Sequence, residues 1–129
     1  MVVVIDDDKV QGMVIAETIN KAGVEAQHIT RWFELTHILQ KRAISCLVID
    51  YFLEDGWQGP EVAKLLRSFG CKETPIYFTS SDSSEVVRRQ CESAGHPFIP
   101  KKWRWLLSNI VVASVLRKHN FQARLSGEV

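Results

Sequence analysis

The chain has 129 residues, a net charge of +1 at pH 7 and 46% hydrophobic residues, which fits one soluble domain with its own core. A net charge this small argues against a nucleic-acid-binding domain or a domain that binds an anionic membrane. The three cysteines, Cys46, Cys71 and Cys91, are too widely spaced for a disulfide framework and indicate a reducing compartment, here the cytoplasm. No apolar run approaches the roughly 20 residues that cross a bilayer, and no signal-peptide pattern precedes the first apolar run.

The chain begins with a strand, a turn and a helix. Val2–Ile5 is a run of β-branched residues that predicts a strand buried on both faces. Asp6–Asp8 form the turn. Apolar residues at helical spacing over Lys9–Lys21 predict a helix that Gly23 ends. The weaker alternation over Val24–Ile29 predicts a second, more exposed strand.

The central part repeats this order. A helix is predicted over Trp32–Lys41, followed by an apolar central strand over Ile44–Ile49. The loop Asp50–Gly59 leads to a third helix, because a proline in the first turn and an apolar stripe over Pro60–Phe69 are typical of a helix. Gly70 ends this helix.

Two further strands and one helix follow. Pro75–Thr79 predicts the fourth strand. Asp82 and Glu85 have the spacing of a capping box, which predicts the start of a helix that runs to Gly95. Pro97–Ile99 predicts a brief fifth strand.

The last helix is predicted over about Trp103–Lys118, and the remaining segment His119–Val129 shows no periodicity. The chain therefore divides into a folded domain over 1–118 and a C-terminal tail, or the start of a linker, over 119–129. Five strands alternating with five helices predict a flavodoxin-like, doubly wound α/β fold with a five-stranded parallel sheet in the order 2-1-3-4-5.

Polar side chains follow four of the predicted strands. Asp6 and Asp7 follow the first strand, Asp50 the third and Lys101 the fifth, while Ser80 comes directly after the fourth. All of them fall at the carboxyl edge of a parallel sheet, where such folds bind ligands. Since strands one and three are neighbours in this order, Asp50 is expected beside the acidic pair.

Crowded carboxylates call for a cation. Two charges about 4 Å apart repel by roughly 4 kcal/mol at an effective dielectric near 20. A few hard oxygen ligands with room for waters and a phosphoryl group favour Mg²⁺. With Lys101 as a cation and the Ser80 hydroxyl as a donor, this is a site for phosphoryl transfer to a carboxylate, with Asp50 as the nucleophile.

Four motifs carry a family resemblance. They are IDDD at Ile5–Asp8, DYFLEDGWQG at Asp50–Gly59, PIYFTSS at Pro75–Ser81 and PKKW at Pro100–Trp103. Together, in this order and at βα junctions, they resemble the receiver domain of two-component response regulators. The resemblance runs from about Val2 to Arg117 and thus covers nearly the whole chain.

The resemblance implies a role for each site residue. Asp50 matches the aspartate that a histidine kinase or histidine phosphotransfer protein phosphorylates. Asp6 and Asp7 match the acidic pair that binds Mg²⁺ together with Asp50, and the backbone carbonyl of Phe52 matches a further ligand. The resemblance also implies a cytoplasmic signalling phosphoacceptor, which catalyses only its own phosphorylation and dephosphorylation and is not otherwise an enzyme.

The switch residues follow from the same resemblance. Ser80, five residues after Pro75, matches the switch hydroxyl, and Thr79 is the weaker candidate. Lys101 matches the family's lysine, and Phe98 matches the switch aromatic, without the hydroxyl that tyrosine has in many relatives.

The chain departs from the family pattern in its loops. Glu54 and Lys102 stand where prolines are usual, and the loop from Asp50 to Gly59 is one residue longer. The missing proline after Leu53 and the Lys101-Lys102 pair support an alternative interpretation, a receiver-like interaction module that signals without phosphorylation. A Mg²⁺-dependent phosphohydrolase is a weaker alternative, because Phe52 occupies the position of its second acid.

The last helix is apolar around much of its circumference, which is typical of deep burial or of a partner interface. The resemblance implies that the last two helices form a surface for a second copy or an effector, and simple core packing is the alternative. The histidines have no metal-binding spacing and are expected to be structural or exposed: His28, His37, His96 and His119.

Overall fold

A parallel sheet with the strand order β2-β1-β3-β4 forms the centre of the computed structural model, which describes residues 1–127, without the side chains of 120–123. Its strands are β1 (Val2–Ile5), β2 (Ala26–Ile29), β3 (Cys46–Asp50) and β4 (Ile76–Thr79). The α-helices are α1 (Lys9–Lys21), α2 (Leu35–Leu39), α3 (Gly59–Ser68), α4 (Glu85–Ser93) and α5 (Arg104–Leu125). The 3₁₀ turns are η1 (Trp32–Glu34), η2 (Glu54–Gly56) and η3 (Lys101–Trp103). The expected doubly wound α/β fold with five helices is confirmed.

The predicted fifth strand is wrong. Within residues 1–127, the segment Pro97–Ile99 forms only one bridge, between Phe98 and Phe78 of β4. Phe78 N donates to Pro97 O and Ile99 N donates to Phe78 O, both at 2.9 Å. Pro97 has no N–H with which to extend this ladder toward the start of β4. The sheet thus has four strands, and the segment lies at its edge beside β4.

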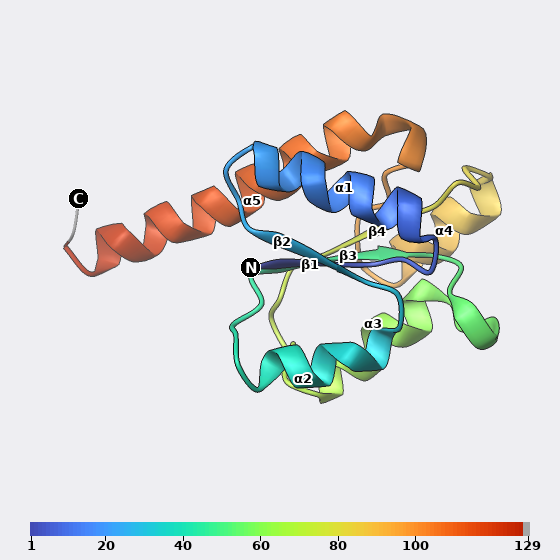
Figure 1. Ribbon diagram of the computed structural model, residues 1–129, viewed down its shortest axis with the longest axis horizontal. Helices are drawn as coiled ribbons and strands as arrows, with labels where there is room; N and C mark the ends of the chain where they lie inside the picture. The colour runs from blue at the N-terminus through green and yellow to red at the C-terminus, as the bar shows by residue number, and fades with distance from the viewer. Residues whose placement is uncertain (128–129) are drawn as a thin grey trace.

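Helices cover both faces of the sheet (Figure 1), and each face has its own core. One face, with Val2, Val4 and Val48, packs against α1 and α5. The opposite face, with Ile5 and Ile49, packs against α2 and α3. Every residue of β1 and β3 is buried, as the unbroken apolar runs predicted.

Helix α5 is longer than expected. It continues to Leu125 and projects past the sheet in Figure 1, whereas the predicted helix ended near Lys118. Between these positions there is no glycine or proline to stop it; the first glycine is Gly127, with φ +76°. Most of the predicted tail over 119–129 is therefore helical. Residues 128–129, the last two of that tail, lie outside the described residues.

Helix α4 has a different cap from the predicted one. Its N-cap is Ser84, whose Oγ accepts from Val87 N at 3.4 Å. Asp82 instead accepts from Ser84 N at 2.8 Å and orders the turn before the helix. The capping box was wrong because two serines stand between its members, and the one nearer the helix takes the capping position.

Candidate functional site

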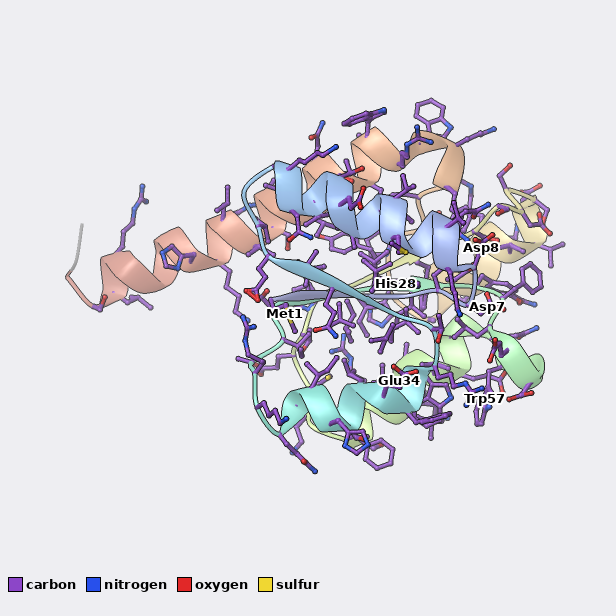
Figure 2. The ribbon with its side chains drawn as sticks, in the orientation of Figure 1. Met1, Asp7, Asp8, His28, Glu34 and Trp57 are labelled. Atoms are coloured by element: carbon purple, nitrogen blue, oxygen red, sulfur yellow. The ribbon has the colours of Figure 1, made fainter. Side chains whose placement is uncertain are left out.

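The acidic cluster results from the pairing of β1 with β3. In the parallel register Ile5 lies opposite Ile49, so the next residues, Asp6 and Asp50, come to the same carboxyl edge. One carboxylate oxygen from each of Asp6, Asp7 and Asp50 lies within 4.8 Å of the others. Figure 2 shows Asp7 at this end of the sheet, just before α1.

Lys101 lies between the two buried acids. Its Nζ is 2.9 Å from Asp50 Oδ2 and 2.8 Å from Asp6 Oδ2, and its side chain is 11% exposed. The backbone of η3 positions it, because Lys101 N donates to Ser80 O at 3.0 Å. Burial alone would lower the pKa of Lys101, but its contacts with Asp6 and Asp50 outweigh burial and raise it. The ammonium therefore stays charged at neutral pH.

The environment of Asp50 disfavours its ionised form. Burial, together with the negative charge of Asp6, raises the pKa of Asp50 to about 7 in spite of the opposing effect of Lys101. One lysine thus does not neutralise the cluster. A further cation at this position would favour the ionised form of Asp50.

The turn Asp6–Asp8 is held by its own side chains. Asp6 Oδ1 accepts from Asp8 N at 2.9 Å, and Asp8 Oδ1 accepts from Gln11 N at 3.1 Å, which caps α1. Asp8 is thus a helix cap, whereas Asp6 and Asp7 face the cluster. Asp6 Oδ2 is buried and has no hydrogen bond to any described residue, although Lys101 lies within ion-pair distance.

The loop after β3 closes on itself. Phe52 N donates to Asp50 Oδ1 at 3.3 Å, and Leu53 N donates to Trp57 O at 2.9 Å. Gly59 lets α3 approach the site, because a Cβ there would lie 2.8 Å from Asp50 O. The longer loop is therefore folded into a compact hairpin. The Phe52 carbonyl remains a predicted ligand.

Two hydroxyls lie at the end of β4. Ser80 Oγ accepts from Asp82 N at 3.0 Å, so its own proton remains available for an acceptor. Thr79 is paired with Asp50 in the sheet, and its buried Oγ1 has no partner among the described residues. Both candidate switch hydroxyls thus lie at the strand end beside Asp50. Their switch roles stay predictions.

Phe98 lies away from the cluster, buried between β4 and α4. Arg88 of α4 covers it, with the guanidinium carbon 5.4 Å from the ring centroid. A groove between α4 and η3 opens beside it, lined by Arg88, Phe98, Lys102, Trp103 and Leu106, among others. Phe98, whose switch role stays a prediction, thus lies between the sheet edge and an exposed groove.

The residues present fit Mg²⁺. The donor set consists of hard carboxylate oxygens. Asp6 Oδ2 is buried, and the Lys101 ammonium, 2.8 Å away, already places a positive charge on it, so the position suits a cation. Asp6, Asp7 and Asp50 are the residues that would hold the ion.

Sequence reasoning missed two contacts around the site. Tyr51, directly after Asp50, donates its hydroxyl to Gln90 of α4 and so connects the loop to that helix. His28 bonds to the backbone carbonyl of Asp6 at 2.7 Å. A lone histidine and a strand-end tyrosine give no local pattern, so only the fold could reveal these contacts.

The fold is shared with known receiver domains. The receiver domain of the Francisella response regulator 1452 is similar with a TM-score of 0.76 and 21% identity, over 91% of this chain and 97% of that one. The chemotaxis response regulator CheY4 of Vibrio cholerae is similar with a TM-score of 0.69 and 19% sequence identity, over 85% of this chain and 96% of that one. The N-terminal domain of a response regulator/sensory box/GGDEF 3-domain protein from Carboxydothermus hydrogenoformans has a TM-score of 0.74 and 19% sequence identity, over 93% of this chain and 98% of that one.

The comparison with curated proteins gives no match. In the part of the chain that the structure describes, no helix has both the length and the apolar character needed to cross a membrane. The family model of the response regulator receiver domain matches residues 2–105, which include the whole acidic cluster and Lys101. This chain belongs to the response regulator receiver domain family, whose members are signalling domains of two-component systems.

Proposed function

We propose that this receiver domain accepts a phosphoryl group on Asp50 from a histidine kinase or histidine phosphotransfer protein in the cytoplasm. The observation that carries the proposal is the position of Lys101 Nζ, within 3 Å of both Asp50 and Asp6 at a buried strand edge. Domains of the receiver family typically use Mg²⁺. Here Asp6, Asp7 and Asp50, with the Phe52 carbonyl, would hold it.

Each side chain has a part in the transfer. Asp50 Oδ attacks phosphorus; the bond to the donor imidazole nitrogen breaks, and that nitrogen keeps the electron pair. When bound, Mg²⁺ would offset the charges of the acids and of the incoming phosphoryl oxygens. Lys101 is close enough to move from the Asp50 carboxylate to a phosphoryl oxygen while still paired with Asp6. Asp50 must be ionised to attack, and its raised pKa links the reaction to cation binding.

Ser80 is proposed to report the new charge. Its free hydroxyl proton can be donated to a phosphoryl oxygen, while Asp82 N holds the oxygen from the other side. A contact of this kind favours one conformation only if it forms better there. Phe98 is buried, and the Arg88 guanidinium covers its ring. Both residues line the groove between α4 and η3, next to this strand end.

The proposed output surface lies at the start of α5. Trp103, Trp105 and Leu106 are 54%, 66% and 45% exposed there. Over residues 93–127 the chain has no acid and six basic residues: Lys101, Lys102, Arg104, Arg117, Lys118 and Arg124. Because Lys102 and Arg104 alternate with Trp103 and Trp105, we propose that this surface binds an acidic partner with apolar anchor residues, or an acidic face of a second copy.

Electrophoresis in a phosphate-binding gel tests the phosphoacceptor function. Incubation with acetyl phosphate and Mg²⁺ is expected to give a slower band that hydroxylamine removes, because an acyl phosphate is labile to it. Asp50→Asn is expected to give no such band. If the wild-type chain also gives none and does not bind Mg²⁺, the proposal is wrong and the unphosphorylated interaction module is favoured.

A further inference from the structure

We infer that His28 is a positioning residue for the magnesium-binding acids, and that Gly12 is a glycine because the His28 ring occupies the space of its side chain. The inference rests on the proposed function for the role of Asp6 and Asp7. It concerns how this chain fixes their turn, which the site residues themselves do not explain.

The first observation is a missing backbone bond at the end of β1. In the ladder between β1 and β2, Val2 N donates to Glu25 O and Asp6 N donates to Ile29 O. The Asp6 carbonyl comes next in the ladder, but in the part of the chain that the structure describes no backbone N–H donates to it. A buried carbonyl without a donor is costly.

His28 supplies the missing donor. Its Nε2 lies 2.7 Å from Asp6 O. Because a carbonyl oxygen only accepts, Nε2 must carry the proton. His28 stands opposite Val4 in the register, so its ring reaches two residues along the sheet to the point where the chain turns. Figure 2 shows the ring between the sheet and α1, on the side of Asp7 and Asp8.

The second observation is the close approach of α1. Gly12 is buried, and a Cβ built on it would lie 2.2 Å from His28 Nε2 and 2.3 Å from its Cδ2. Ring and side chain cannot occupy this space together. Gly12 is the fourth residue of α1. Inside a helix glycine is less favourable than alanine by about 1 kcal/mol, so the packing of the ring accounts for it.

The two observations describe one device. The turn that carries Asp6 and Asp7 is held at Asp6 N by Ile29, at Asp6 Oδ1 by Asp8 N and at Asp6 O by His28. Lys101 also reaches Asp6 from outside the turn, but only at its carboxylate. Among the described residues, His28 is the one outside side chain that bonds to the backbone of the turn. Loss of the His28 bond would free the Asp6 peptide to rotate and would loosen the ligand set. Loss of a hydrogen-bond partner that orients a ligand side chain typically costs 10–100-fold in metal affinity, and His28 orients the backbone that carries such ligands.

The test compares Mg²⁺ affinity by titration calorimetry in four folded variants. His28→Leu removes the donor at similar size, and Gly12→Ala displaces the intact ring; both are expected to bind Mg²⁺ about tenfold more weakly. His28→Gln keeps a donor at the place of Nε2 and is expected to stay close to wild type. His37→Leu, the same change on an exposed histidine of α2, is the matched control.

Two NMR measurements test the role of His28 without Mg²⁺ binding. The ¹⁵N spectrum of the His28 ring is expected to show the proton on Nε2. The amide signals of Asp7 and Asp8 are expected to move in His28→Leu and Gly12→Ala and to return in His28→Gln.

The outcomes separate the two proposals. Wild-type protein that binds no Mg²⁺ contradicts the proposed function, and the amide signals then decide about His28 on their own. Unchanged affinity and unchanged amides in His28→Leu and Gly12→Ala would overturn the positioning role. So would a His28→Gln variant as impaired as His28→Leu, because then only ring packing matters.

Discussion

Lys101 Nζ and Asp50 Oδ2 lie 2.9 Å apart, yet Asp50 retains a pKa raised to about 7. Burial and the neighbouring Asp6 outweigh the lysine. The domain therefore folds around an acid whose ionised form is disfavoured. This conflict makes the site responsive to a cation or to a new covalent group.

The first prediction concerns stability and pH without Mg²⁺. The folded pKa of Asp50 is about 7, above its ordinary value of 3.8, so the folded state binds the proton more tightly. Its contribution to stability is present below about pH 4 and is lost as pH rises through 7. We expect the free energy of unfolding to fall by about 2–3 kcal/mol between pH 5 and 8 through this group.

Urea unfolding at several pH values, in wild type and Asp50→Asn, checks this. The difference between the two profiles isolates Asp50 from His96, whose pKa is lowered by burial. The variant is expected to be the more stable protein at pH 8. Parallel profiles for the two proteins would contradict the account.

The second prediction distinguishes the two hydroxyls at the end of β4. Thr79→Val removes a buried hydroxyl that has no partner and is expected to raise the free energy of unfolding by about 1 kcal/mol. Ser80→Ala leaves Asp82 N without its acceptor and is expected to lower it by about 1 kcal/mol. Chemical denaturation measures both, and equal effects would show that the hydroxyls have the same environment.

The third prediction concerns the loop after β3. Asp55 has φ +61°, the one non-glycine residue with a positive φ among the described residues. Asp55→Gly removes the strain and is expected to stabilise the domain by about 0.5 kcal/mol, whereas Asp55→Ala is expected to destabilise it by about 1 kcal/mol. Thermal unfolding checks the order of the three proteins. An alanine variant as stable as the glycine variant would exclude strain at this position.

The fourth prediction tests the cap of α4. Ser84→Ala removes the side chain that accepts from Val87 N and is expected to cost about 1 kcal/mol. Glu85→Ala removes an exposed ion pair with Arg89 and is expected to cost less than about 0.5 kcal/mol. If urea titrations show a larger loss of unfolding free energy for Glu85→Ala than for Ser84→Ala, the capping box predicted from the sequence is favoured instead.

The sheet and its acidic edge were predictable because apolar runs such as Val2–Ile5 end abruptly on aspartates. Parallel pairing then brings Asp6 and Asp50 to one edge. This inference depends only on the direction and order of strands, and it holds for β1 to β4.

The remaining features depend on single contacts that periodicity does not report. Pro97 limits the fifth strand to one bridge, and the absence of a stop before Gly127 lengthens α5. The bond from His28 to Asp6 joins residues 22 positions apart and needs Gly12 from a third element. Such features appear only when the chain is folded.

The mass of the intact protein after incubation with acetyl phosphate and Mg²⁺ tests the central claim most directly. We expect a gain of one phosphoryl group, about 80 Da, that requires Mg²⁺ and is absent in Asp50→Asn. An unchanged mass in the wild-type protein, or a gain that persists in Asp50→Asn, would contradict it.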